Sequence, residues 1–138
     1  MTRKPKPKKR KSRKLTPQEK EQRSQIREIT TILKNIGFSK IPHIDGKEIV
    51  YDGRTTEMDD IFINENVILV TEYTIGSPGK HLLAKDVFYK KVLSNPRAFI
   101  SFMLHDEKLK HFKKFYDEKI NKVYSKNELR LKILYCSK

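Results

Sequence analysis

Apolar residues recur at helical spacing in the first patterned segment of the chain. Four aliphatic residues separated by three, four and three positions share one face of a helix. They are Ile26, Ile29, Leu33 and Ile36. Thr16 is a suitable N-cap, and Glu19 follows it at capping-box spacing. With Pro17 at the first helical position and Gly37 after the last, the pattern predicts a helix from about residue 17 to residue 36.

Shorter runs with strand character fill residues 41–76. Asp45-Gly46 and Asp52-Gly53 are turn signals, and the residues between them predict a short strand over 48–51. Two longer runs, 58–64 and 67–74, are separated by Asn64-Glu65-Asn66 and predict an antiparallel hairpin.

The second half of the chain returns to helical spacing. Residues 81–95 predict a second helix that Pro96 stops, and the apolar run 98–104 predicts a buried strand. Residues 106–125 predict a third amphipathic helix, and five of its apolar residues share the inward face. They are Leu109, Phe112, Tyr116, Ile120 and Val123. The alternating run 128–136 predicts a final strand.

This order of elements predicts an α/β fold with a mixed sheet flanked by helices. A helix between two strands of one sheet implies a right-handed crossover and a parallel pair, whereas the hairpin is antiparallel. We expect one domain over residues 15–138, with an αβββαβ core over about 17–104 and a C-terminal helix and strand added to it. An alternative is that the chain is the N-terminal part of a larger protein, because it ends in an apolar run that a partner domain or a second copy could cover.

Charge narrows the choice of partner. The chain carries 31 Lys and Arg against 17 Asp and Glu, a net charge of +14. Nine of the basic residues fall within residues 1–14, which predicts a disordered arm that contacts nucleic-acid phosphates without reading sequence. The residues assigned to this contact are Arg3, Lys4, Lys8, Lys9, Arg10, Lys11, Arg13 and Lys14. The ordinary alternative is a solubility tail or a ribosome-associated tail.

The same composition excludes several classes of protein. No apolar run is long enough to span a bilayer, and the basic N-terminus lacks the apolar segment of a secretory signal. Cys136 is the single cysteine, so an internal disulfide and a multi-cysteine zinc site are excluded. We therefore expect a cytoplasmic protein, nuclear if the source is eukaryotic. DNA is the leading partner and RNA the alternative.

Acidic residues stand where the strand pattern calls for apolar ones. Glu72 shares a face of its strand with Ile68 and Val70, and the partner strand carries Asp59 and Asp60, which face opposite ways. One aspartate must therefore lie on the side of Glu72, within reach of a shared cation. Mg²⁺ or Mn²⁺ suits a pair of carboxylates. The structural alternative is that Asp59 caps a turn and Glu72 pairs with a lysine.

The order of elements with "EMDDIF" and "VILVTEYT" resembles the PD-(D/E)XK, or restriction-endonuclease-like, nuclease superfamily. The resemblance covers about residues 17–104. It implies that Asp59 is the first metal-binding acid, with Asp60 as the alternative, that Glu72 is the second, and that Glu28 on the first helix assists.

The motif lysine of that family is absent from its usual place. Thr74 stands there, giving E-x-T in place of E-x-K. Lys80 in the following loop and Lys85 on the next helix are the candidates to replace it, because some members of the family supply the lysine from elsewhere.

The resemblance implies a Mg²⁺-dependent (or Mn²⁺-dependent) endonuclease that hydrolyses DNA phosphodiester bonds, in restriction, phage defence or repair. The alternative is a non-catalytic nucleic-acid-binding module with a degenerate nuclease fold. An assembled form, as a homodimer or within a larger complex, is also compatible with the apolar end of the chain.

Overall fold

The computed structural model describes residues 14–74 and 79–137, and for residues 79–82 and 137 only the backbone. The first fourteen residues, the predicted basic arm, thus lie outside the described part except for the exposed Lys14. The architecture is mixed α/β, as the sequence predicted. Within the described residues, no helix combines the length and apolar character needed to cross a membrane.

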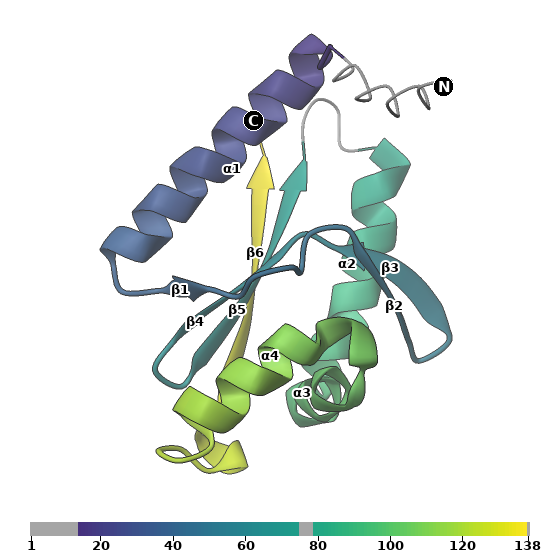
Figure 1. Ribbon diagram of the computed structural model, residues 1–138. Helices are drawn as coiled ribbons and strands as arrows, with labels where there is room; N and C mark the ends of the chain where they lie inside the picture. The colour runs from purple at the N-terminus through teal and green to yellow at the C-terminus, as the bar shows by residue number, and fades with distance from the viewer. Residues whose placement is uncertain (1–13, 75–78, 138) are drawn as a thin grey trace, which may run out of the picture.

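A four-stranded mixed sheet forms the centre of the molecule (Figure 1). Its strands stand in the order β1 (Ser39–Lys40), β4 (Asp60–Asn64), β5 (Val67–Thr74) and β6 (Arg130–Ser137). β4 is antiparallel to both β1 and β5, whereas β5 and β6 run parallel. The predicted hairpin is therefore confirmed, and it turns at Glu65, which has a φ of 53°.

Helix α1 (Pro17–Asn35) covers one face of this sheet, as the left side of Figure 1 shows. The Thr16 side chain accepts a hydrogen bond from the Glu19 amide, and Gly37, with a φ of 107°, follows the helix end. Leu33 packs with Phe62 and Leu69, and the partly buried Ile29, Phe38 and Leu134 complete this small cluster. The predicted helix is confirmed, but Ile36 is 61% exposed because it is the C-cap residue rather than part of the buried face.

The other face of the sheet carries the main core. Helices α2 (Gly79–Ser94), α3 (Pro96–His105) and α4 (Lys110–Phe115) lie between β5 and β6 in the chain and form the crossover of the parallel pair. Their buried residues, among them Phe88, Phe99 and Phe112, join Ile61 and Ile68 of the sheet in one cluster. Successive residues of β4 and β5 consequently alternate between the small α1 cluster and the large core.

A second hairpin stands beside the sheet. β2 (Lys47–Tyr51) and β3 (Arg54–Met58) pair with each other only, through a turn at Asp52-Gly53 where both residues have positive φ. The turn was predicted, but the pattern merged residues 58–64 into one strand and left β3 unrecognised. Figure 1 shows this hairpin reaching across toward α2.

The predicted strand over residues 98–104 is wrong, because these residues form α3. Asn95 caps the helix by accepting from the Ala98 amide, and Pro96 takes the first turn. Phe99, Ile100 and Met103 share the buried face with Leu104. A short apolar run bounded by a cap and a proline is compatible with a buried helix as well as a strand. The fourth strand of the sheet is β6, so the sheet extends past the predicted boundary at residue 104.

The third predicted helix is shorter and irregular. A turn of 3₁₀ helix, η1 (Glu107–Leu109), leads into α4, and a wider π turn, η2 (Tyr116–Ile120), ends the segment. The predicted inward residues Leu109, Phe112, Tyr116 and Ile120 are buried, whereas Val123 lies beyond the helix and is 68% exposed. A final 3₁₀ turn, η3 (Lys126–Glu128), precedes β6.

Replacement of Phe99 by alanine tests the assignment of α3 to the core. The ring is fully buried, and truncation of such a residue costs about 3–5 kcal/mol. We expect urea unfolding of Phe99→Ala to show a loss of this size. The control Leu93→Ala removes a side chain that is 46% exposed and should cost about 1 kcal/mol or less. Equal losses in the two variants would contradict the assignment.

Candidate metal centre

Two carboxylates converge at the junction of the hairpins. The register of β4 and β5 pairs Asp60 with Thr71, so Asp59, one residue earlier, lies across from Glu72. The Asp59 carboxylate accepts a hydrogen bond of 2.8 Å from the Tyr73 amide, which fixes it against β5. Glu72 faces the main core with Ile68 and Val70, and 2% of it is exposed. Asp59 is half-buried, so the carboxylate pair is accessible to solvent at Asp59 and buried at Glu72.

Lys85 of α2 lies against the Glu72 carboxylate. Its Nζ is 3.3 Å from Oε1 and 3.2 Å from Oε2 of Glu72, and it also donates to the Glu57 backbone oxygen. Lys85 is buried, with 6% of its surface exposed. Because a buried ammonium needs compensating groups, this pairing fixes α2 against the sheet and against the end of β3.

Tyr89 is a fourth member of the site, and the sequence analysis did not identify it as one. Its hydroxyl donates to Glu72 Oε1, and its ring is almost fully buried. The phenol follows Lys85 by one helical turn, so both side chains point to the same carboxylate. The (i, i+4) spacing of a lysine and a tyrosine on a helix after an acid-bearing strand was the available signal. Burial raises the pKa of Tyr89 far above its usual value, and the charge of Glu72 adds to the rise.

The pKa of Glu72 reflects the crowding of the site. Burial, and after it the neighbouring Asp59 carboxylate, raise the pKa of Glu72 from 4.5 to about 8, against the lowering effects of the Tyr89 hydrogen bond and the Lys85 charge. Asp59 and Glu72 bring two carboxylates together, and Lys85 supplies a single positive charge beside them. A divalent ion would supply further positive charge.

The residues suit a hard divalent ion. Mg²⁺ is usually bound by one or two carboxylates, several waters and phosphate oxygens of the substrate. Asp59 and Glu72 provide the carboxylates, and the half-exposed side of Asp59 leaves room for water and phosphate. Among the described residues, no group of three His, Cys, Asp or Glu side chains is placed to enclose a metal.

Asp60 lies on the opposite face. It alternates with Asp59 and shares the α1 side with Phe62, where its Oδ1 is 3.5 Å from the Lys40 ammonium. Burial raises its pKa, and Lys40 acts against that rise. The structure thus separates Asp60 from Glu72, and of the two alternative first acids only Asp59 shares a face with Glu72.

The remaining predicted site residues are placed less centrally. Glu28 is exposed on α1, the helix that packs against the face opposite to Glu72. Thr74 is half-buried at the end of β5. The side chain of Lys80 and the basic residues of 3–13 lie outside the described residues. Lys85 is therefore the candidate lysine whose position relative to the acids is defined.

Comparisons of the chain with protein-family models, with curated proteins and with solved structures returned no match. The chemistry of the site accordingly follows from its own geometry.

The raised pKa of Glu72 predicts how stability depends on pH in the metal-free protein. Between pH 4.5 and about 8 the folded state holds a proton that the unfolded state has lost, so the free energy of unfolding falls as the pH rises through this range. Glu72→Gln removes the titration. We expect thermal unfolding in EDTA to favour this variant over the wild type more strongly at pH 8.5 than at pH 5, by a few kcal/mol.

Glu118→Gln, at an exposed carboxylate, is the control and should follow the wild type at both values of pH. A stability difference between Glu72→Gln and the wild type that does not change with pH would contradict the assignment of a raised pKa to Glu72.

Proposed function

We propose that the protein is a metal-dependent nuclease that hydrolyses phosphodiester bonds in DNA. The observation that carries this proposal is the convergence of Asp59, the residue before β4, with Glu72 of β5 and Lys85 of α2. The order of helix, antiparallel strands, crossover helix and parallel strand supports a restriction-endonuclease-like core, with β6 in the last place and the β2–β3 hairpin inserted.

Each side chain has a defined task in this proposal. Asp59 and Glu72 would hold Mg²⁺ or Mn²⁺, which would supply a water nucleophile of lowered pKa and stabilise the departing oxygen. The Lys85 ammonium, which lies against Glu72, would orient the attacking water or neutralise the phosphate. Tyr89 orients the Glu72 carboxylate through its hydrogen bond to Oε1.

The basic composition supports nucleic acid as the substrate. The net charge of +14 attracts a polyanion, and the basic residues of 1–14 would add phosphate contacts that are independent of sequence. By analogy with the family that the chain resembles, restriction, phage defence or repair would use such an activity. The analogy does not choose among them.

A specific observation favours a second candidate, a nucleic-acid-binding module without catalysis. Both oxygens of Glu72 already have protein partners, Lys85 and Tyr89, and the raised pKa keeps a proton on this carboxyl near neutrality. If this arrangement persists when metal is supplied, the acids serve structure and only the positive surface acts.

Cleavage assays with matched carboxylate variants decide between the two candidates. Plasmid, single-stranded DNA and RNA are incubated with Mg²⁺ or Mn²⁺ and the wild type, Asp59→Asn or Glu72→Gln. We expect losses of at least 10²-fold in both variants, since the bound ion is lost. Asp60→Asn changes the neighbouring acid on the other face and should keep activity within a few-fold of the wild type.

Cleavage that survives in Asp59→Asn would remove the assignment of the site. No cleavage by the wild type, together with nucleic-acid binding that does not depend on the metal, would establish the binding module instead.

Lys85 and Tyr89 have different tasks in this proposal, so their variants should show different kinetic defects. Lys85→Met should lower kcat by about 10²–10³-fold, because a preorganised charge at the transition state is lost. Tyr89→Phe should lower the affinity for Mn²⁺ by about 10-fold, as for other groups that orient a metal ligand, and saturating Mn²⁺ should restore most of its kcat. Calorimetry with Mn²⁺ and steady-state kinetics give the two readouts. Identical defects in both variants would argue against the division of tasks.

A further inference from the structure

A pocket of about 310 Å³ opens beside the carboxylate pair, between the β2–β3 hairpin and α2. Ala84, Lys85 and Phe88 of the helix form one side of the pocket, and Arg54, Thr55 and Glu57 of β3 form the other. Lys85 and Phe88 are buried, whereas the residues of β3 nearest the solvent are exposed. This volume lies at the lower end of the range for small-molecule sites.

The pocket and the candidate metal centre share a wall. Lys85 lines the pocket, and its ammonium contacts both the Glu72 carboxylate and the Glu57 carbonyl. Glu57 also lines the pocket and precedes Asp59 by two residues. A group seated in the pocket would therefore lie against Lys85, whose ammonium contacts the Glu72 carboxylate on its other side.

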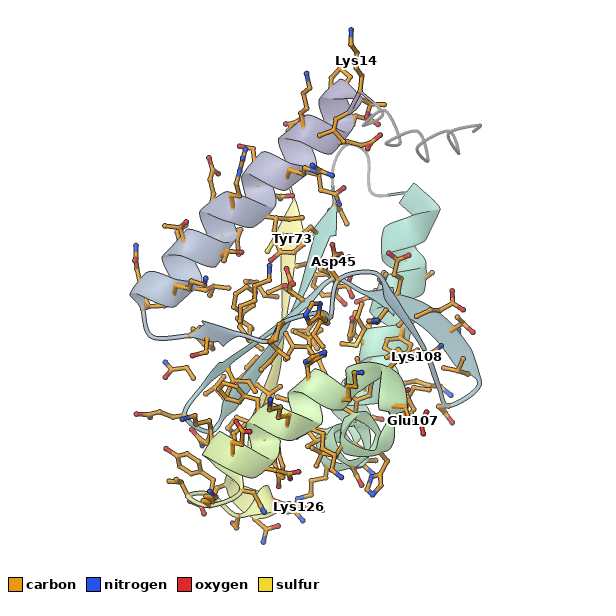
Figure 2. All side chains as sticks on the ribbon, viewed as in Figure 1. Lys14, Asp45, Tyr73, Glu107, Lys108 and Lys126 are labelled. Atoms are coloured by element: carbon orange, nitrogen blue, oxygen red, sulfur yellow. The ribbon has the colours of Figure 1, made fainter. Side chains whose placement is uncertain are left out.

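Two contacts hold the hairpin in place and with it the shape of the pocket. Lys91 of α2 pairs with Asp52 at 2.7 Å, and Lys108 donates to the Glu48 carbonyl at 2.8 Å. Figure 2 shows Lys108 next to the hairpin. The Phe88 ring is fixed edge-to-face against Tyr51 and Tyr89. A site fixed in this way does not need to be ordered by its ligand, which lowers the cost of binding.

The chemistry of the walls selects the occupant. Phe88, which is largely buried, is the aromatic residue of the lining, and Glu48, Arg54, Thr55 and Glu57 are polar. The two glutamates are balanced by Arg54 and Lys85, so the lining favours an uncharged ligand, and a purely apolar ligand would leave the polar groups unpaired. A nucleobase has an aromatic face with donors and acceptors on its edge, and proteins hold unstacked bases through such contacts.

We propose that this pocket binds one unstacked base of the substrate, adjacent to the phosphate that is hydrolysed. The inference rests on the proposed function for the identity of the polymer. It assigns the enzyme a substrate in which at least one base is unpaired or can be turned out of the helix. Single strands, junctions and distorted duplexes would be preferred to regular duplex DNA.

Filling the pocket tests the proposal. Ala84→Phe places a ring in the pocket from α2, and Thr55→Tyr fills it from β3; both positions are exposed, so the fold should tolerate the changes. Leu83→Phe is the matched control, because Leu83 neighbours Ala84 on α2, is 67% exposed and does not line the pocket. Circular dichroism checks that each variant is folded.

The substrates are 12-nucleotide DNA strands in which one base at a time is removed. With Mn²⁺ and the wild type, we expect kcat/KM to fall by about 10-fold or more when the missing base is next to the cleaved bond, since the contacts of that base with the pocket are lost. Leu83→Phe should repeat this profile. Ala84→Phe and Thr55→Tyr should cleave the intact strand about 10-fold more slowly and show no dependence on that base.

Binding in EDTA separates this inference from the nuclease proposal. A thymine strand with one central 2-aminopurine should show a new fluorescence lifetime with the wild type and Leu83→Phe, and should lack it with both filled variants. If this difference in fluorescence is seen but neither the wild type nor any variant cleaves, the base-binding pocket is supported and the nuclease proposal is contradicted. The proposal of a base pocket would be overturned if kcat/KM were the same for every base-deleted strand. It would also be overturned if Ala84→Phe and Thr55→Tyr cleaved as Leu83→Phe does. Either result would leave the nuclease proposal in place.

Discussion

The buried Glu72 carboxylate is the group around which the rest of the structure is arranged. A lone ionised acid in a core is costly, and here three elements meet to compensate it. Lys85 and Tyr89 approach from one turn of α2, and Lys85 also binds the end of β3 through the Glu57 carbonyl. The strand, the helix and the hairpin are thus fixed to one another by one polar cluster rather than by apolar packing alone.

The two faces of the sheet provide different environments. On the α1 side, Leu33, Phe62 and Leu69 form a small apolar cluster with Asp60 beside it. On the other side the large core surrounds the carboxylate pair, and the pocket opens at its edge. Because successive residues of a strand alternate between faces, Asp59 and Asp60 belong to different environments although they are adjacent in the sequence. The register of β4 and β5 therefore decides which of the two aspartates lies on the side of Glu72.

Local patterns were enough to predict α1, the β4–β5 hairpin and β6, since caps, turn residues and periodicity are all short-range signals. The pairing of Glu72 with an aspartate also followed from the alternation of side chains along the strands. Lys85 was one of two candidate lysines, with Lys80, and both came from the family resemblance. Residues 98–104 could not be assigned in this way, because an apolar run of that length suits a buried strand and a buried helix equally. The cap at Asn95 and the proline at 96 favour a helix for this run, and β6 occupies the fourth position of the sheet.

The part of the site that the sequence did not reveal depends on tertiary placement. Tyr89 has the spacing of a core aromatic, and only the approach of α2 to β5 turns its hydroxyl toward Glu72. The pocket likewise depends on where the β2–β3 hairpin lies. Ile49 and Met58 anchor the hairpin in the main core, and Lys91 and Lys108 contact it over 39 and 60 residues of sequence separation. No local pattern encodes contacts over such separations.

The parallel pairing of β5 with β6 has a consequence for how the molecule assembles. β6 pairs with β5 along its whole length, from Val67 opposite Arg130 to Thr74 opposite Ser137, so more than fifty residues must be made and folded back before this contact can close. Pairings of such separation form late and slowly. The hairpins can form early, but the strand that bears Glu72 has an unprotected edge until the last strand docks. Newly made chains would therefore expose the backbone edge of β5 until residues 130–137 have been synthesised and have docked.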